Sequence, residues 1–447
     1  MSKTAVPAVE TALENQRIGG LQIRVALLCG LVQVCDGYDL NAIAWAVPSL
    51  IKGWHLPPPA FTLAFLWSSI GIMVGALSAG PLGDRIGRKP LLLASLTIFG
   101  VASVLSAFAP SLGVLSLLRF FTGIGIGGGF SGAASLTGDY TPERRRALMI
   151  MASFTGAPIG GFVGGQIVAL WLLPTFGWQA IFIAGGIFPL VLVALLAVWL
   201  PESPRFLMAR GNLSGRDEAL LRRLDLAGVR GQEHPLDIAR GNPIAMLFSR
   251  GYALQTVLMW VIYFCSLMNL FLFAYWMPTV LNLIGMTPPQ AVFASSLRDC
   301  GAIFAVLYLG VLIDRFGPER SLALHYAAGA VFIAMIALVA LPYALLLIVT
   351  FFAGMTIIGS QTGANGTCGK LYPARMRTSG LGWALGIGRL GGIAAPALGG
   401  YLLSIGLPPT HIFLSACAFA LIAAAATALL ALRAPRAAAL TVNEAVS

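Results

Sequence analysis

Two carboxylates lie in the middle of the first long apolar segment of the chain. In the stretch Asp36-Gly37-Tyr38-Asp39 the two acids are three residues apart, so a helix presents both on one face. With a rise of about 1.5 Å per residue, a helix over residues 21–50 carries Asp36 near the centre of a bilayer. Burying either charge in hydrocarbon costs about 2.5–3.5 kcal/mol, and intramembrane acids therefore tend to face a water-filled pathway. One interpretation is a polar kink that helps helices pack; the other, which we favour, is a proton or substrate site.

Three arginines also fall inside apolar segments. Arginine presents a planar fork that binds a carboxylate through two hydrogen bonds. Arg389, among the small residues of Gly386–Gly392, is either the anchor of a carboxylate substrate or the partner of a buried acid. Arg119 has the same two roles open to it. For Arg298 and the adjacent Asp299 we favour partners on neighbouring helices over contact with a substrate.

Further polar and aromatic side chains would complete such a site. Asn269 follows Asp39 by 230 residues, and Asn365 lies in another apolar segment. A carboxyl group buried away from water holds its proton more tightly than an exposed one, so either aspartate could load a proton on one side of a membrane and release it on the other. Apolar walls with a few polar groups suit an aromatic ring. The aromatic candidates are Tyr38, Trp67, Tyr263, Phe264, Tyr275, Trp276 and Trp383.

The elements that position these residues are long apolar segments. Hydrophobic residues make up 58% of the 447 residues and charged residues 10%, whereas soluble domains carry about 25% charged residues. Segments of about 20 residues indicate helices and exclude a barrel of alternating strands. We therefore predict an all-α membrane protein of twelve transmembrane helices, over residues 21–50, 60–82, 90–110, 112–137, 146–172, 178–200, 253–281, 291–313, 321–341, 343–369, 378–403 and 409–432.

The basic residues fix an orientation for these helices. Of the 28 lysines and arginines, 24 fall in alternate loops or the tails, and Lys52 alone falls in the opposite set. Basic loops stay on the cytoplasmic side, so both termini are expected there. The net charge of +11 therefore reflects membrane orientation and predicts no nucleic-acid partner.

The two halves of the chain repeat. Gly80-x-x-x-Asp84-Arg85-x-Gly87 recurs 230 residues later as Gly310-x-x-x-Asp314-Arg315-x-Gly317. Repeats of six helices are typical of transporters whose site lies at the membrane midplane between two bundles. The predicted domains are a cytoplasmic tail (1–20), an N-terminal six-helix bundle (21–200), a cytoplasmic linker (201–252), a C-terminal six-helix bundle (253–432) and a second cytoplasmic tail (433–447).

The repeated motif suits a gate, because Asp84 can pair with cationic groups in one state and release them in another. The stretch Gly80–Lys89 resembles the signature of the major facilitator superfamily. Two further stretches fit that resemblance, Asp139-Tyr140-Thr141-Pro142 with the basic residues after it and Pro201–Arg205. Residues 36–39 resemble the first-span signature of the superfamily's aromatic acid:proton symporter branch. The gating candidates are Gly80, Asp84, Arg85, Gly87, Arg88, Asp139, Arg145, Asp314 and Arg315.

The resemblance implies a multi-pass protein of a bacterial cytoplasmic membrane that imports a small aromatic carboxylate of the benzoate type together with protons, and that works as a monomer. It implies that Asp36 and Asp39 are needed for transport, and that Arg119 and Arg389 act within the membrane. Two features depart from it: Asp139 stands where the family motif usually has Glu, and the pair Arg298–Asp299 is not part of the branch pattern.

Three alternatives stay open at this point. The chain could carry a sugar, an osmolyte or a non-aromatic acid; it could be an exporter; or it could be a membrane sensor that binds a ligand without moving it. An enzyme is not expected, since no nucleophile–base set or phosphate loop occurs. No metal site or cofactor other than the coupling proton is expected, because histidines and cysteines lack ligand spacing.

Overall fold

The computed structural model describes residues 18–210, 214–224, 226, 247–249, 252–372 and 374–444. Within these residues it contains helices and no strand. Eleven helical stretches, one of them the composite Arg144–Phe176, are long and apolar enough to cross a membrane. The all-α class is therefore confirmed. Residues 1–17 of the predicted N-terminal tail lie outside the described residues. Half of the predicted linker at 201–252 lies outside them too.

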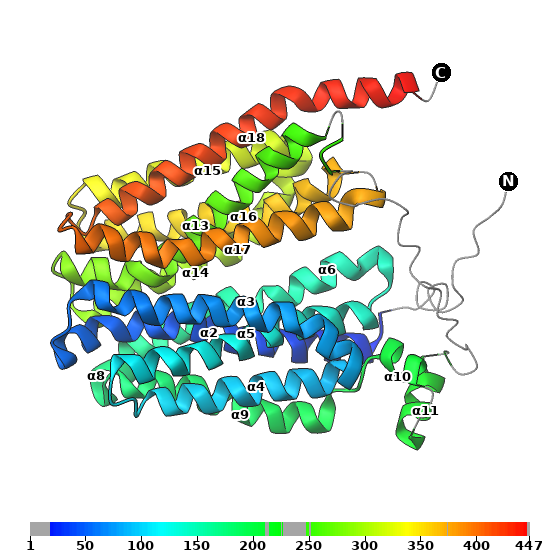
Figure 1. Ribbon diagram of the computed structural model, residues 1–447, viewed down its shortest axis with the longest axis horizontal. Helices are drawn as coiled ribbons and strands as arrows, with labels where there is room; N and C mark the ends of the chain where they lie inside the picture. Colours follow the sequence, from blue (N-terminus) through cyan, green and yellow to red (C-terminus); the bar gives the residue numbers. More distant parts are fainter. Residues whose placement is uncertain are drawn as a thin grey trace. The chain divides into compact units, whose positions relative to one another are not determined.

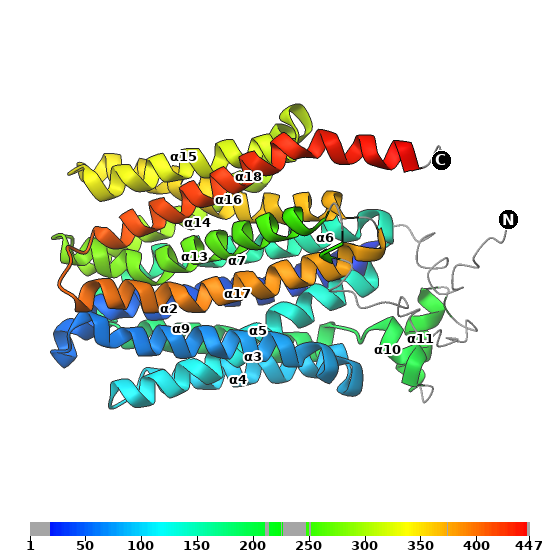
Figure 2. The ribbon, with the colours of Figure 1, turned by 45° about the horizontal axis from the view of Figure 1, so that its top comes forward.

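The described residues form two compact units, which are considered separately (Figure 1). Unit 1 takes its described residues from Met1–Ala42, Trp67–Gly161 and Gln179–Asp237. Helix α4 lies beside α5 and α9, as both ribbon views show (Figures 1 and 2). Leu92, Leu96 and Phe99 of α4 form the centre of its apolar core. The helices that contribute to unit 1 are α2 (Gly20–Trp54), α3 (Thr62–Ile86), α4 (Arg88–Ser106), α5 (Leu112–Tyr140), α6 (Glu143–Phe154), α7 (Gly156–Ile167), α9 (Gln179–Trp199), α10 (Pro204–Arg210) and α11 (Gly215–Arg223).

Unit 2 takes its described residues from Ile43–Leu66, Phe162–Trp178 and Ile238–Ser447. Helix α13 packs against α17 and α18, and α15 lies beside α18 (Figure 2). Tyr263, Tyr326 and Tyr372 belong to its core. Its elements are α13 (Ala253–Leu283), α14 (Pro288–Phe316), α15 (Pro318–Leu338), α16 (Tyr343–Leu371), α17 (Ala374–Ser404), α18 (His411–Glu444), the short helices η1 (Pro58–Phe61) and α8 (Leu173–Phe176), and the π-helix η2 (Val168–Leu172).

The compact units differ from the two sequence halves. Residues 43–66 and 162–178, from the first half, cluster with the second half. Within unit 2, Phe65 stacks on Tyr275, with ring centroids 4.8 Å apart, and the Gln166 amide donates to the Ser296 hydroxyl over 2.7 Å. Helices α2, α3 and α7 therefore contribute residues to both units.

The repeat is visible in the backbone. Gly87 ends the turn between α3 and α4 with φ +103°, and Gly317 ends the turn between α14 and α15 with φ +82°. Side chains with a Cβ rarely adopt such angles, so the last glycine of each motif copy permits the turn. The motif spacing thus produces the same helix–turn–helix twice.

Three predicted spans differ in detail from the helices found. Helix α18 continues to Glu444, into the segment predicted as the second tail. The span expected at 146–172 is found as one candidate span, Arg144–Phe176, but its helix is interrupted at Thr155 between α6 and α7 and includes the π-helical turn η2. The span expected at 291–313 is the helix α14, but α14 is absent from the eleven candidates in the described residues. It carries the charged pair Arg298–Asp299 in its middle.

Candidate functional site

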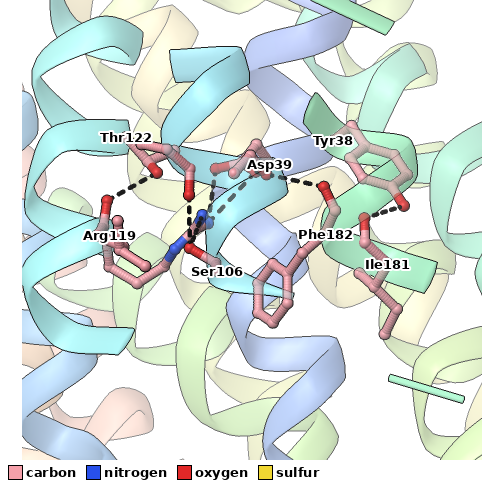
Figure 3. A network of polar contacts seen from close by, with 10 residues as sticks. Tyr38, Asp39, Ser106, Arg119, Thr122, Ile181 and Phe182 are labelled. Atoms are coloured by element: carbon pink, nitrogen blue, oxygen red, sulfur yellow. Dashed lines mark hydrogen bonds and ion pairs between the residues drawn. The ribbon is translucent and has the colours of Figure 1, made fainter. Parts of the chain in front are cut away.

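The tetrapeptide Asp36–Asp39 forms one turn of α2. Its residues contact different helices of unit 1. The Gly37 backbone lies directly against the backbone of Ala157 on α7, where no Cβ would fit. Tyr38 donates its hydroxyl to the carbonyl of Ile181 on α9 over 2.9 Å (Figure 3). Asp39 faces α4 and α5. The turn is therefore a packing centre of unit 1 as well as the place of its two buried acids.

Asp39 forms an ion pair with Arg119 of α5. The guanidinium Nη1 lies 3.1 Å from Oδ2 and 3.3 Å from Oδ1, and Figure 3 shows the arginine reaching toward the carboxylate. The Ser103 hydroxyl of α4 donates to Asp39 Oδ1 over 2.8 Å. Arg119 also donates to the Ser106 hydroxyl over 2.9 Å and lies 4.8 Å from the ring centre of Phe182. Of the two roles open to Arg119, the geometry supports that of an ion-pair partner.

Asp36 has no partner, although it lies only three residues earlier. Both carboxyl oxygens are buried and neither makes a hydrogen bond within the described residues. The side chain is 3% exposed and lies against Gly129 of α5 and Val32. A lone carboxylate at such a place is costly, and it becomes neutral by taking up a proton. Asp36 is thus the acid of the pair that is suited to bind and release a proton.

Gln33 is a polar residue that the sequence argument passed over. It lies one turn before the tetrapeptide, is fully buried, and has neither amide atom hydrogen-bonded. A glutamine inside an apolar run was the available signal. Gln33 and Asp36 together form an unpaired polar stripe on α2.

Arg389 lies on α17 in unit 2. Arg119 and Arg298 have carboxylate partners, whereas Arg389 has no ion pair and no hydrogen bond within the described residues. Its glycine neighbours lie against aromatic residues of α13: Gly391 contacts the Phe264 backbone and Gly392 the Phe271 ring. Tyr275, on the same helix as these aromatics, is near enough to interact electrostatically with the guanidinium. A cation that has no ion-pair partner in the described part of the chain, on a helix that packs against aromatic residues, suits an aromatic acid.

The other intramembrane candidates have different surroundings. Asn269 is buried and its Oδ1 has no partner, whereas Asn365 accepts a hydrogen bond from the Tyr263 hydroxyl over 2.7 Å. Arg298 and Asp299 pair with one another on α14, at 2.9 and 3.0 Å. Their charges thus balance each other within one helix, and the expected partners on neighbouring helices stay a prediction.

The Gly80–Lys89 motif lies at the end of α3 and the start of α4. Asp84 pairs with Arg88 over 2.6 Å, and the carboxylate is largely exposed. Arg85 is exposed as well, and nothing fills the space where a Cβ on Gly80 would lie. In the second copy of the motif, Arg315 lies over the ring of Phe316 on α14, the helix that also carries Asp314. In the first copy of the motif, the exposed side chains of Asp84 and Arg85 are available to pair with groups on other helices.

Glu202, like Gln33, was given no role of its own in the sequence analysis. Its Oε1 accepts hydrogen bonds from the backbone N–H groups of Arg88 and Lys89, over 2.9 and 3.1 Å. These are orphan donors at the start of α4, where an acid also complements the helix dipole. Its backbone carbonyl accepts the Tyr140 hydroxyl. The motif at 201–205 therefore holds the α3–α4 turn.

Asp139 is held by the same motif. The Ser203 hydroxyl donates to Asp139 Oδ2 over 2.7 Å, and Arg205 lies 3.7 Å from Oδ1. Arg145, the remaining gating candidate in this region, is exposed at the start of α6. The residues singled out at 80–89, 139–140 and 201–205, which are far apart in sequence, thus form one polar cluster in unit 1.

Comparisons with known proteins agree with this arrangement. A family model described as Major Facilitator Superfamily matches residues 29–396 and 259–446. A gallate transporter of Pseudomonas putida is 36% identical over 89% of both chains. A 4-hydroxybenzoate transporter of Pseudomonas aeruginosa is 34% identical over 91% of this chain and 93% of its own.

The fold has solved relatives too. The xylose transporter of E. coli, in an inward-open conformation, superposes with a TM-score of 0.70 at 18% identity, over 90% of this chain and 94% of its own. These matches cover almost the whole length of each protein, and the relatives are transporters and not enzymes. The chain therefore belongs to the major facilitator superfamily, where it groups with transporters of the aromatic acid branch.

Proposed function

We propose that the protein imports a small aromatic carboxylate together with protons across the cytoplasmic membrane of a bacterium. The observation that carries this proposal is the distribution of intramembrane charge. Asp39 and Arg119 neutralise each other, as do Arg298 and Asp299. Asp36 and Arg389 remain: within the described residues, Asp36 in unit 1 and Arg389 in unit 2 have no ion-pair partner.

Arg389 is the anchor for the substrate carboxylate in this proposal. A benzoate-type acid brings a carboxylate that fits the guanidinium fork and a ring that fits the aromatic side chains of α13. The relatives that transport gallate and 4-hydroxybenzoate support this substrate class. Asn365, which accepts a hydrogen bond from the buried Tyr263 of the same helix α13 and is itself exposed on α16, offers a polar group for ring hydroxyls.

Asp36 is the proton carrier. Its carboxyl group binds a proton on the outer side and releases it on the inner side, and the neutral form removes the cost of an unpaired buried charge while the bundles change state. Asp84, Arg85 and the cluster around Glu202 form the cytoplasmic latch that distinguishes the two states.

The proposal includes a topology of twelve spans with both termini in the cytoplasm and a monomer as the working unit. Helix α14 is the twelfth span, because its 29 residues suffice to cross a bilayer and its charged pair is internally balanced. The asymmetry of basic residues supports the orientation.

Uptake by proteoliposomes tests the substrate class. Labelled benzoate, 4-hydroxybenzoate and gallate would be compared with glucose and shikimate under an inward proton gradient. We expect uptake of at least one aromatic acid, and inhibition of that uptake by other aromatic acids but not by glucose. Uptake restricted to a non-aromatic compound would contradict the proposal, and so would binding without flux.

A further inference from the structure

A small cavity with a few polar groups in its lining lies inside unit 2. Its volume is about 10 Å³, which is room for about one water molecule. Ser266 and Asn269 of α13 and His325 and Tyr326 of α15 line it. All four side chains are nearly inaccessible, and each has a polar atom without a hydrogen bond within the described residues: Ser266 Oγ, Asn269 Oδ1, His325 Nε2 and Tyr326 Oη.

The contacts of His325 favour the neutral tautomer that carries its hydrogen on Nδ1. Nδ1 lies 3.3 Å from the carbonyl oxygen of Thr356 on α16. A carbonyl oxygen can only accept, so this contact requires a hydrogen on Nδ1. In the neutral ring Nε2 is then an acceptor, and Nε2 is the unsatisfied atom at the cavity.

The four atoms together match the hydrogen bonds of one water molecule. His325 Nε2 and Asn269 Oδ1 can only accept, so a water would donate to both. The Ser266 and Tyr326 hydroxyls can each donate to the water oxygen. Two acceptors and two donors are the full complement of a water, and buried waters typically bridge polar groups that lack other partners.

The repeat relates this cavity to the acids of unit 1. At the offset of 230 residues, Ser266 corresponds to Asp36 and Asn269 to Asp39. The second half therefore has polar but uncharged side chains at the positions that correspond to Asp36 and Asp39. A titratable group is present there instead on the neighbouring helix α15, at His325.

We propose that this cavity is a second proton-binding site, in which a proton from the outer aqueous side binds His325 Nε2 beside a water held by Ser266, Asn269 and Tyr326. The added proton converts the imidazole to imidazolium, whose Nε2–H then donates to the water; the water keeps its own two hydrogens and turns to accept. The proposal rests on the proton-coupled import described above. Each transport cycle would then move two protons, one on Asp36 and one on His325, together with one carboxylate anion. The cycle would therefore carry net positive charge inward.

The titratable neighbours of His325 are all neutral groups. Tyr308 of α14 lies with its ring 5.3 Å away, Tyr326 is on the same helix, and Cys265 of α13 lies beside Tyr326. On α18, Cys417 donates to the Ala330 carbonyl of α15, and α16 presents the hydroxyls of Thr356 and Ser360. No ion pair to His325 occurs among the described residues. A proton arriving there thus has no fixed countercharge, and its uptake depends on the water and the membrane potential.

Two measurements test the site. In the first, the purified protein with ¹⁵N-labelled histidine is titrated in lipid nanodiscs, and the His325 signals are assigned by their loss in His325→Gln. We expect a hydrogen on Nδ1 at high pH and protonation of Nε2 as the pH is lowered. A His325 that stays neutral throughout the range in which the protein is folded would overturn the proposal. This readout requires no substrate, so it stands even if aromatic acid uptake fails.

In the second, the ratio of protons to substrate is measured in proteoliposomes from the reversal potential of flux. We expect the ratio to fall by one proton in His325→Gln, and uptake to lose its acceleration by an inside-negative potential. Tyr326→Phe removes one hydrogen-bond donor to the water and keeps the ring. It should lower the ratio as well, and it tests the site if His325→Gln does not fold. His411→Gln, at the start of α18, is the matched control and should behave as wild type. An unchanged ratio in both cavity variants would overturn the coupling role.

Discussion

At the scale of single residues, the decisive contrast is between Asp36 and Asp39. They carry the same group on the same turn of α2, yet Asp39 is paired with Arg119 and Asp36 is not. The sequence predicted two buried acids and an arginine. It could not predict which acid is paired, because that depends on how α2 is rotated against α4 and α5, and both acids share one helix face.

The pairing predicts different effects on stability. Asp39→Asn leaves the Arg119 charge buried and should destabilise the fold by about 3–5 kcal/mol, as should Arg119→Gln. The double variant removes both charges and should recover most of that loss. Asp36→Asn, one turn away and without a partner, is the control and should leave unfolding nearly unchanged. Thermal unfolding of the purified variants in detergent measures all four. Simple addition of the two single losses would contradict the ion pair.

The anchor role of Arg389 predicts a defect in substrate affinity. Arg389→Lys keeps the charge but loses the planar fork, so a bidentate contact becomes a single one. Since a hydrogen bond to a charged group contributes about 1.5–3 kcal/mol, KM for the aromatic acid should rise about tenfold or more. Initial uptake rates over a range of substrate concentrations measure this. Arg222→Lys, on the exposed α11, is the control; an unchanged KM in Arg389→Lys would remove the anchor.

At the scale of elements, most helices begin and end close to the predicted boundaries, because long apolar runs and glycine turns determine them locally. Two boundaries differ: α18 continues to Glu444, and the span at 146–172 is interrupted at Thr155, where its glycines bring α7 into backbone contact with α2. The role of Glu202 was also not predictable, since it caps a helix more than a hundred residues earlier in the chain.

The Glu202 cap predicts a local loss of stability. Glu202→Ala leaves the first N–H groups of α4 without an acceptor, which should cost about 0.5–2 kcal/mol. It should also loosen α10 from the α3–α4 turn and increase proteolysis near residues 204–210. Glu218→Ala, on α11, serves as the control because Glu218 forms only an exposed pair with Arg222. Equal unfolding temperatures and equal cleavage of the two variants would contradict the cap.

At the scale of the whole molecule, hydropathy and the repeat predicted an all-helical membrane protein, since apolar length is a property of the sequence alone. The compact units could not be predicted: residues 43–66 and 162–178 cluster with the second half through contacts such as Phe65–Tyr275 and Gln166–Ser296. These contacts depend on tertiary packing, on which helix periodicity carries no information.

The proposed topology has its own test. A fluorescent protein fused to the C-terminus should fold and fluoresce, because it stays in the cytoplasm, whereas alkaline phosphatase at the same place should be inactive. Alkaline phosphatase inserted after Gly53, beside the lone basic residue of the opposite side, should be active. The reverse pattern at either place would contradict the orientation.

The most direct measurement of the central claim compares two modes of transport in Asp36→Asn. If Asp36 carries the coupling proton, the variant should fail to accumulate an aromatic acid under an inward proton gradient, yet should still exchange labelled for unlabelled substrate across the same membrane. Wild-type protein and Asp217→Asn, on the exposed α11, should do both. Full gradient-driven accumulation by Asp36→Asn would contradict the account.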